Sequence, residues 1–212
     1  MSLETVTVEH LPASHKVHVA LFRDVRNTAF LHQQLLGRNP DFEYAFIDAS
    51  VVSSGPITSV TSARAKSMSG LQLLSAVFKA TSAAVNGALR TPNVHSEIVS
   101  SMSSSNNIAD AYRRYGISPS TKDLIVVKVT FPADNGADPL THDQVWEHLK
   151  ANVEGEASPV TDEQIATTSD VAKVRKYYKL NGLKWLDEIK DDNVRQREME
   201  SLVISAMALR GV

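Results

Sequence analysis

The sequence of 212 residues contains no cysteine, which excludes disulfides, thiolate zinc sites and a cysteine nucleophile. Long apolar runs are also missing, because stretches such as Ile125-Val126-Val127 are far shorter than the roughly 18 residues of a membrane span. No basic segment followed by an apolar one opens the chain, so we do not expect a secretory signal. These absences favour a protein of the cytoplasm or nucleus that does not bind membranes.

The common catalytic motifs are absent as well. The chain has no GxGxxG, GxxxxGK[ST], HExxH or GxSxG pattern, which predicts neither a cofactor nor a metal site. His95-Ser96-Glu97 superficially suggests a triad, but on the strand expected at 94–99 Ser96 points away from the other two. His142 and His148 lie six positions apart on an expected helix, so they face different directions. We therefore expect a protein that is not an enzyme.

Charge is unevenly distributed although the net charge is only −2. Residues 132–170 contain one basic and nine acidic side chains, so the rest of the chain carries 21 basic and 15 acidic ones. Hydrophobic residues make up 42% of the sequence, enough to fill a sizeable core. These values predict a single globular domain over 1–212 whose surface is basic outside one acidic stretch.

Periodicity predicts an α/β (α+β) fold with a helical C-terminal third. Strands are expected at 16–22, 44–48, 94–99 and 123–130. Helices are expected at 28–36, 70–89, 108–115, 141–152, 162–167, 170–180 and 194–209. Because helices separate most of these strands, we expect a mixed sheet of four to five strands that is covered by helices.

Two of the expected helices have more apolar surface than a core requires. The helix at 70–89 carries one charge and is apolar on most faces. In the C-terminal helix, Ile204 and Ala208 lie off the core stripe, and Leu209 follows. The five residues of that core stripe are Met199, Leu202, Val203, Ala206 and Met207. Either the terminal helix is buried all round, or Ile204, Ala208 and Leu209 bind a protein partner.

Two basic segments are candidates for binding nucleic acid. Arg113 and Arg114 follow a polar loop, 103–107, that leads into a helix N-terminus, where free N–H groups can bind an anion or simply be capped. Lys173 and Lys176 share a helix face beside Tyr177, which could be a solvated surface or a place where a base stacks next to phosphate contacts. We expect the fold to bring some of these residues into one surface.

An ordered set of short segments resembles the family of the small regulatory subunit of the KEOPS/EKC complex, the PRPK-binding protein (TPRKB) family. The set comprises His95-Ser96-Glu97-Ile98-Val99, then Asn107-Ile108, Arg113-Arg114 and Gly116-Ile117, and finally Ala208-Leu209-Arg210-Gly211. The opening strand–helix–strand from Val17 to Asp48 is similar too. Segments at about 54–68 and 132–139 look like loop insertions relative to compact members.

The resemblance implies a non-catalytic subunit without cofactors. It would bind the atypical kinase/ATPase of the complex, contact other KEOPS subunits indirectly, and bind tRNA by the 3′ acceptor end. In this way it would support threonylcarbamoyladenosine modification of tRNA in the cytoplasm and nucleus. A small α/β enzyme with a dispersed active site is the alternative, and it should gather its ionisable groups in one pocket.

Overall fold

The computed structural model describes residues 3–53, 70–132 and 138–210. The strands are β1 (Leu3–Val6), β2 (Lys16–Arg23), β3 (Ala45–Asp48), β4 (Leu124–Thr130) and β5 (Glu156–Ser158). The helices are α1 (Thr28–Leu36), α2 (Leu71–Val85), α3 (Val94–Ser101), α4 (Ile108–Tyr115), α5 (His142–Asn152), α6 (Asp162–Thr168), α7 (Val171–Tyr177), α8 (Lys184–Glu188) and α9 (Asp192–Ala208), with 3-10 turns η1 (Pro40–Phe42) and η2 (Ala49–Val51). The expected insertion at 54–68 and most of that at 132–139 lie outside the described residues.

The sheet confirms the α+β class but corrects the expected strand directions. Four strands follow the order β1-β2-β4-β3, and β5 pairs with β2. Every strand pair in the described part of the chain is antiparallel, so the sheet is not mixed. The expectation failed because β4 lies between β2 and β3, so the two strands joined through α1 are not neighbours. β1 and β5 were not predicted from the sequence.

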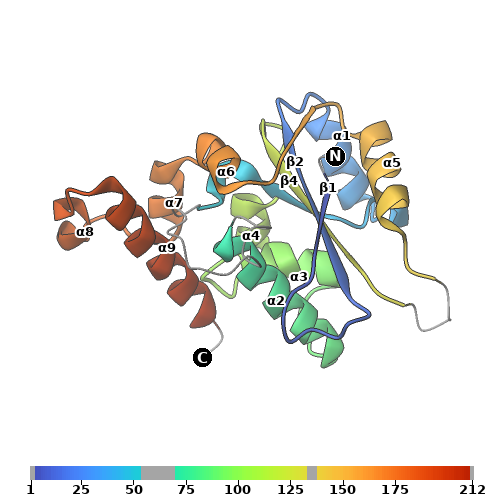
Figure 1. Ribbon diagram of the computed structural model, residues 1–212, viewed down its shortest axis with the longest axis horizontal. Coiled ribbons are helices and arrows are strands. Elements are labelled where there is room, and N and C mark those ends of the chain that lie inside the picture. Colours follow the sequence, from blue (N-terminus) through green and yellow to red (C-terminus); the bar gives the residue numbers. More distant parts are fainter. Residues whose placement is uncertain (1–2, 54–69, 133–137, 211–212) are drawn as a thin grey trace.

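Both faces of the sheet are buried, which explains why its central strands are apolar almost throughout. Val19 and Leu21 of β2 pack with the helices α2, α3, α7 and α9. Ala20 and Phe22, which point the other way, pack with α1 and α5. Figure 1 shows α1 and α5 on one side of the sheet and the remaining helices on the other side. The side with more helices carries the surfaces described below.

The expected strand at 94–99 is wrong, because these residues form the helix α3. Asn93 caps this helix by accepting a hydrogen bond from the Ser96 N–H at 2.8 Å. The apolar residues at 94, 98 and 99 fit one helix face as well as they fit a short strand. A six-residue segment with β-branched residues is too short for periodicity to decide, whereas the N-cap was the signal that could have decided it.

The C-terminal third is helical as expected, with β5 as its short strand. The last helix, α9, packs against α2 on the side of the sheet that also holds α3 (Figure 1). Within the described residues, no helix is both long enough and apolar enough to span a bilayer.

Candidate interaction surfaces

Helix α2 has one face in the core and a second apolar face in solvent. Leu73 and Val77 are fully buried against the sheet. Leu71, Phe78 and Val85 lie on the opposite side and are 56%, 40% and 49% exposed. A helix with apolar side chains on both faces exposes more apolar area than an isolated surface helix normally does. The exposed face of α2 is therefore a candidate contact surface.

Helix α9 contributes the other wall of the same surface. Met199, Val203 and Met207 are buried and Leu202 and Ala206 are half-buried against the core, which confirms the expected core stripe. The three candidate partner-binding residues lie off this stripe: Ile204 is half-buried, Ala208 is exposed and Leu209 is 68% exposed. The terminal helix is therefore not buried all round.

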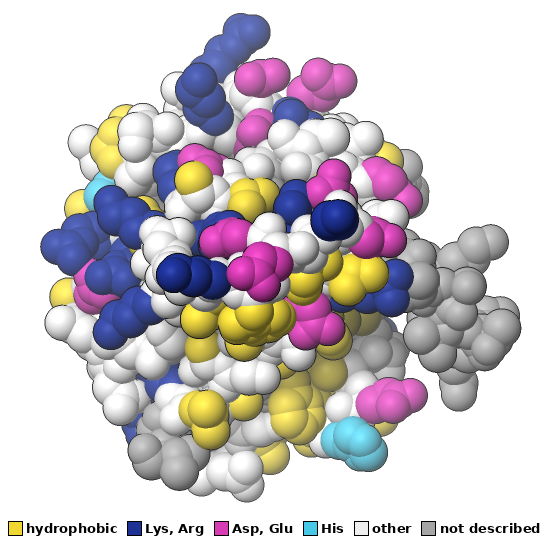
Figure 2. Space-filling view, turned by 90° about the vertical axis from the view of Figure 1, so that its left-hand side faces the viewer, with side chains coloured by type: hydrophobic (Ala, Val, Ile, Leu, Met, Phe, Trp, Pro, Cys, Tyr) yellow, Lys and Arg dark blue, Asp and Glu magenta, His cyan; other side chains and the backbone are white. Residues whose placement is uncertain are grey.

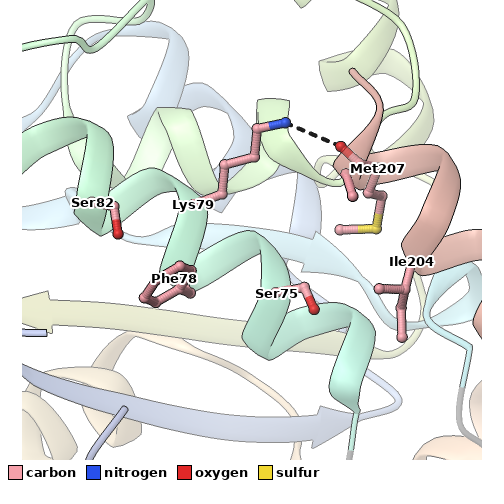
Figure 3. A pocket seen from close by; sticks show the side chains of 7 residues that line it. Ser75, Phe78, Lys79, Ser82, Ile204 and Met207 are labelled. Carbon is pink, nitrogen blue, oxygen red and sulfur yellow. Dashed lines mark hydrogen bonds between the residues drawn. The ribbon is translucent and has the colours of Figure 1, made fainter. Parts of the chain in front are cut away.

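Between α2 and α9 lies a cavity of about 380 Å³ that is open to solvent, which we call the α2–α9 groove. Its lining residues are Ser75, Phe78, Lys79, Ser82, Ile204, Met207 and Ala208. Figure 3 shows these side chains on the two helices. The groove brings together two of the three expected partner-binding residues, Ile204 and Ala208. Its lining is mostly apolar with two small hydroxyls, so it can accept apolar side chains of a protein partner.

The groove is held together by two cations that sequence reasoning missed. The Lys79 ammonium donates hydrogen bonds to the carbonyl oxygens of Met207 and Arg210, at 3.0 and 3.1 Å (Figure 3 shows the first). The Arg210 guanidinium donates to the carbonyl and hydroxyl oxygens of Ser100. These bonds satisfy carbonyls at the end of α9 and fix α9 against α2 and α3. Lys79, the single charge on α2, was the signal available in the sequence.

Helices α4 and α7 bring two of the predicted nucleic-acid-binding residues together. The Arg114 guanidinium carbon lies 5.3 Å from the centre of the Tyr177 ring, within the range of a cation–π contact. Tyr177 also meets Tyr115 edge to face, with ring centres 5.8 Å apart. The Tyr177 ring is thus held in a fixed place beside a positive charge, which suits stacking of an unpaired base.

The predicted basic residues differ in their exposure and in whether their charged groups already have a partner. Arg113 and Arg114 both pair with the carboxylate of Asp110, the latter at 2.8 Å, which offsets part of their charge. Lys173 is half-buried and its ammonium donates to the Ser50 hydroxyl at 3.0 Å, whereas Lys176 is exposed. We call the surface formed by Arg113, Arg114, Lys176 and Tyr177 the α4–α7 surface. Figure 2 shows Lys and Arg side chains gathered on one flank of the visible face, apart from the apolar side chains below its centre.

His95 and Glu97 of the His95-Ser96-Glu97 motif both form hydrogen bonds with backbone N–H groups. His95 is buried, and its Nε2 accepts a hydrogen bond from the Val129 N–H at 3.1 Å. Burial lowers the pKa of His95 to about 3, so the ring is neutral at physiological pH. The Glu97 carboxylate accepts from the N–H groups of Arg90 and Thr91 and from the Thr91 hydroxyl. In the described part of the chain, no three His, Asp or Glu residues are grouped so that they could hold a metal ion.

Comparison with known proteins identifies the family. Residues 22–211 match the family model described as "Kinase binding protein CGI-121". The chain belongs to the CGI-121 family. Its match to the family model begins at the end of β2 and extends past α9, so the residues of both surfaces lie within it.

Curated relatives of this CGI-121 member extend over almost its whole length. It is 76% identical over 212 residues to a protein of Gibberella zeae named "EKC/KEOPS complex subunit CGI121", with full coverage of both chains. It is 45% identical over 222 residues to a protein of the same name from Neurospora crassa, again with full coverage. A relative of Schizosaccharomyces pombe with that name is 28% identical over 196 residues, covering 92% of this chain and 94% of the other.

Proposed function

We propose that this CGI-121 member is a non-catalytic subunit of the EKC/KEOPS complex that works in the cytoplasm and nucleus. It binds the kinase/ATPase subunit through the α2–α9 groove and meets the other subunits through that kinase. It also binds tRNA through the α4–α7 surface and so supports threonylcarbamoyladenosine modification. The observation that carries the proposal is the groove: a kinase-binding family member exposes an apolar cleft built by its terminal helix.

The groove supports kinase docking because burying it would be favourable. Phe78 and Ile204 stand on opposite walls, and neither is fully covered by the rest of the chain. Burial of an apolar side chain stabilises a complex by about 25 cal/mol per Å² removed from water, before the cost of association. Ser75 and Ser82, which also line the groove, let a partner helix approach α2 closely. An amphipathic helix of the kinase fits such a groove.

Ile204→Asp tests the docking site. The substitution places a carboxylate in the groove, where it loses its water when the kinase binds. We expect the binding free energy for the purified kinase subunit to weaken by about 2–5 kcal/mol, measured by calorimetry. Folding should suffer less, because Ile204 is only half-buried and lies off the core stripe.

Val194→Asp is the matched control for this experiment. Val194 is 38% exposed, lies on the same helix and is three turns or so away from the groove. The control variant gains the same charge on the same helix, but outside the groove, so its kinase affinity should stay within about twofold of the wild type. Equal losses for the two variants, or an unfolded Ile204→Asp protein, would show that the groove is not the docking site.

The α4–α7 surface supports tRNA binding through its ring and its charges. Tyr177 is half-buried against Tyr115 and carries Arg114 over its face, so a base and a phosphate could be bound side by side. Unpaired bases stack on aromatic rings irrespective of their sequence. In a tRNA, the single-stranded 3′ end offers such bases without any need to open a duplex. This surface therefore suits the acceptor end better than the paired stems.

Tyr177→Ala and 3′ trimming of the tRNA test this part together. We expect Tyr177→Ala to weaken binding of intact tRNA by about 1–3 kcal/mol, measured by filter binding at fixed salt. Trimming the 3′ end should have a similar effect on the wild type and little further effect on Tyr177→Ala. Tyr177→Phe, the control, keeps the ring and should bind normally. Equal affinity for intact and trimmed tRNA in the wild type would refute acceptor-end binding.

The non-catalytic part of the proposal has its own test. In the one motif that resembled a triad, His95 Nε2 accepts from the Val129 N–H and the Glu97 carboxylate accepts from the N–H and hydroxyl of Thr91, so neither group faces Ser96 as a catalytic base would. The purified chain should therefore not hydrolyse ATP by itself. An activity that co-purifies with the chain and disappears in His95→Ala would favour the enzyme alternative.

A further inference from the structure

A cluster of cations lies at the loop that leads into α4. Arg90 Nη1 donates to the side-chain oxygen of Asn106 at 3.0 Å, and Arg210 Nε points at the same oxygen from 3.4 Å. Two guanidinium groups thus meet on one uncharged amide oxygen. Asn106 and Arg90 are exposed, whereas Arg210 is only 7% exposed. The cluster is therefore open to solvent on the side of Arg90 and Asn106.

The positive charge of this cluster is not neutralised locally. Within the described residues, no carboxylate forms an ion pair with Lys79, Arg90 or Arg210. Glu97 lies near enough to favour the charged forms of Lys79 and Arg210, but it is 6% exposed and accepts three hydrogen bonds from Arg90 and Thr91. Glu97 therefore offsets only part of the charge of Lys79 and Arg210.

The pKa values of two of these cations, Lys79 and Arg210, agree with this geometry. Burial is the main cause that holds the pKa of Lys79 below its ordinary value, and the charges of Arg210 and Arg90 lower it further. Burial also lowers the pKa of Arg210, and Arg90 again contributes. Like charges that are kept together in this way repel one another, so a bound anion would relieve an existing repulsion.

Helix α4 connects the cluster to the α4–α7 surface. Asp110 and Arg114 are four positions apart on α4 and share one face, and Asn106 directly precedes the residue that caps this helix. Asn107 caps the helix, accepting a hydrogen bond from the Asp110 N–H at 3.0 Å. Asn106, with Arg90 bound to it, therefore lies at the N-terminal end of α4, and Arg114 with Tyr177 lies at the C-terminal end.

We propose that Arg90, Asn106 and Arg210 form a phosphate site that binds one backbone phosphodiester of an RNA strand, the strand then running along α4 to Arg114 and Tyr177. Arg90 and the Asn106 amide contact the phosphate, and Arg210 acts from behind as a fixed positive charge. This inference rests on the proposed tRNA binding and names a contact outside the residues that the sequence predicted. The positive end of the α4 dipole adds to the attraction.

Asn106→Asp tests the site because its side-chain carboxylate supplies the negative charge that a bound phosphate would otherwise provide. The new carboxylate would pair with Arg90 and Arg210, so the protein should become more stable to heat while its affinity for tRNA falls about five- to tenfold. The slope of log K against log salt should become shallower by about 0.7, the value for one phosphate on a single strand. A merely structural role for Asn106 predicts the gain in stability without the loss of affinity.

Asn193→Asp is the control with the same change of net charge. Asn193 is exposed and lies at the other end of α9 from Arg210. Its tRNA affinity and salt slope should match the wild type. Arg90→Gln should lose about as much affinity as Asn106→Asp, and Arg90→Lys should recover part of it because the charge remains.

The results of these experiments distinguish failure of the phosphate site from failure of the proposed tRNA binding. If Asn106→Asp and Arg90→Gln bind tRNA like the wild type while Tyr177→Ala binds weakly, the phosphate site is wrong and the α4–α7 surface stands. If inorganic phosphate alone shifts the Arg90 side-chain resonance in NMR spectra but tRNA binding ignores both variants, the site takes free phosphate and the RNA proposal for it is overturned. If the wild type binds no tRNA, both proposals fail.

Discussion

The α2–α9 groove and the α4–α7 surface lie on the same side of the sheet but differ in what they offer a partner. The groove is lined mainly by apolar groups, and its one ammonium, that of Lys79, is used up by carbonyl oxygens. The α4–α7 surface presents Arg114 over the Tyr177 ring, with the exposed side chains of Arg113 and Lys176 on the same two helices. One surface can bind through removal of water from apolar area, and the other through charge and stacking.

This difference means that the two surfaces suit two different kinds of partner. Groove residues come from α2 and α9, whereas those of the basic surface come from α4 and α7. The two sets have no side chain in common, so a substitution in one should leave the other intact. They do share the sheet and the helix α3 beneath them, so loss of the fold should abolish both.

Acidification should have the largest effect, because it acts on the shared fold. Burial is the main cause that lowers the pKa of His18 to about 4 and that of His95 to about 3, against about 6.5 in the unfolded chain. The unfolded state therefore binds protons first, and stability is lost as the pH falls below 6.5. Between pH 7 and 5 we expect a loss of about 2 kcal/mol per histidine in urea unfolding.

The histidine variants provide the control for acidification. His18→Gln and His95→Gln should each remove about half of the pH dependence, whatever they do to stability at pH 7. The pKa of His142 is raised mainly by its hydrogen bond with Asp143, so this half-buried ring adds stability as the pH falls toward 6.5 and contributes no further change below that pH. A free energy of unfolding that does not change between pH 7 and 5 would show that neither buried ring resists protonation.

Salt concentration should affect the two surfaces differently, whereas acidification acts on the fold that they share. Three to four phosphate contacts on a single strand give a slope of about −2 to −3, so raising salt from 50 to 200 mM should weaken tRNA binding by roughly 20- to 60-fold. Kinase binding should change by about twofold or less over the same range, because apolar burial is insensitive to salt at these concentrations. Charge reversal of Arg113 and Arg114 to Glu should weaken tRNA binding and flatten its slope of log K against log salt, and it should leave the salt dependence of kinase binding unchanged. Parallel salt curves for the two partners would contradict the comparison.

The smallest expected effect distinguishes two neighbouring lysines. Lys176 is exposed, so Lys176→Gln should weaken tRNA binding by about two- to fivefold. The Lys173 ammonium already donates to Ser50 and is half-buried, so Lys173→Gln should change tRNA affinity less than the Lys176 variant. Filter binding of both variants beside the wild type checks the order. If Lys173→Gln proves the more damaging, Lys173 must leave Ser50 when RNA binds.

Much of the fold could be predicted because its signals are local. The strands β2, β3 and β4 have the apolar runs of a sheet that is buried on both faces. The core stripe of α9 has the 3.6-residue period and emerged as expected. The expected strand at 94–99 was wrong because six residues fit either period and only the Asn93 cap distinguishes a helix from a strand there.

For the candidate sites, the sequence indicates which residues are basic or aromatic but not how they are arranged. Basic residues and Tyr177 could be picked out one segment at a time, and the structure places Arg114 on that ring. Nothing local relates Arg90 to Arg210, because they meet only through Asn106 after the chain has folded. The pairing of Lys173 with Ser50, 123 positions away, is equally invisible in the sequence.

The bond from Arg210 to Ser100 also matters for how the molecule is made. The two residues are 110 positions apart, so a ribosome releases Ser100 long before it adds the guanidinium that satisfies the Ser100 carbonyl. Until Arg210 has been added, its hydrogen bonds do not hold α9 against α3, and the α9 wall of the groove is not in place. If the kinase binds in the groove as proposed, a chain that ends before Arg210 would offer it an incomplete site.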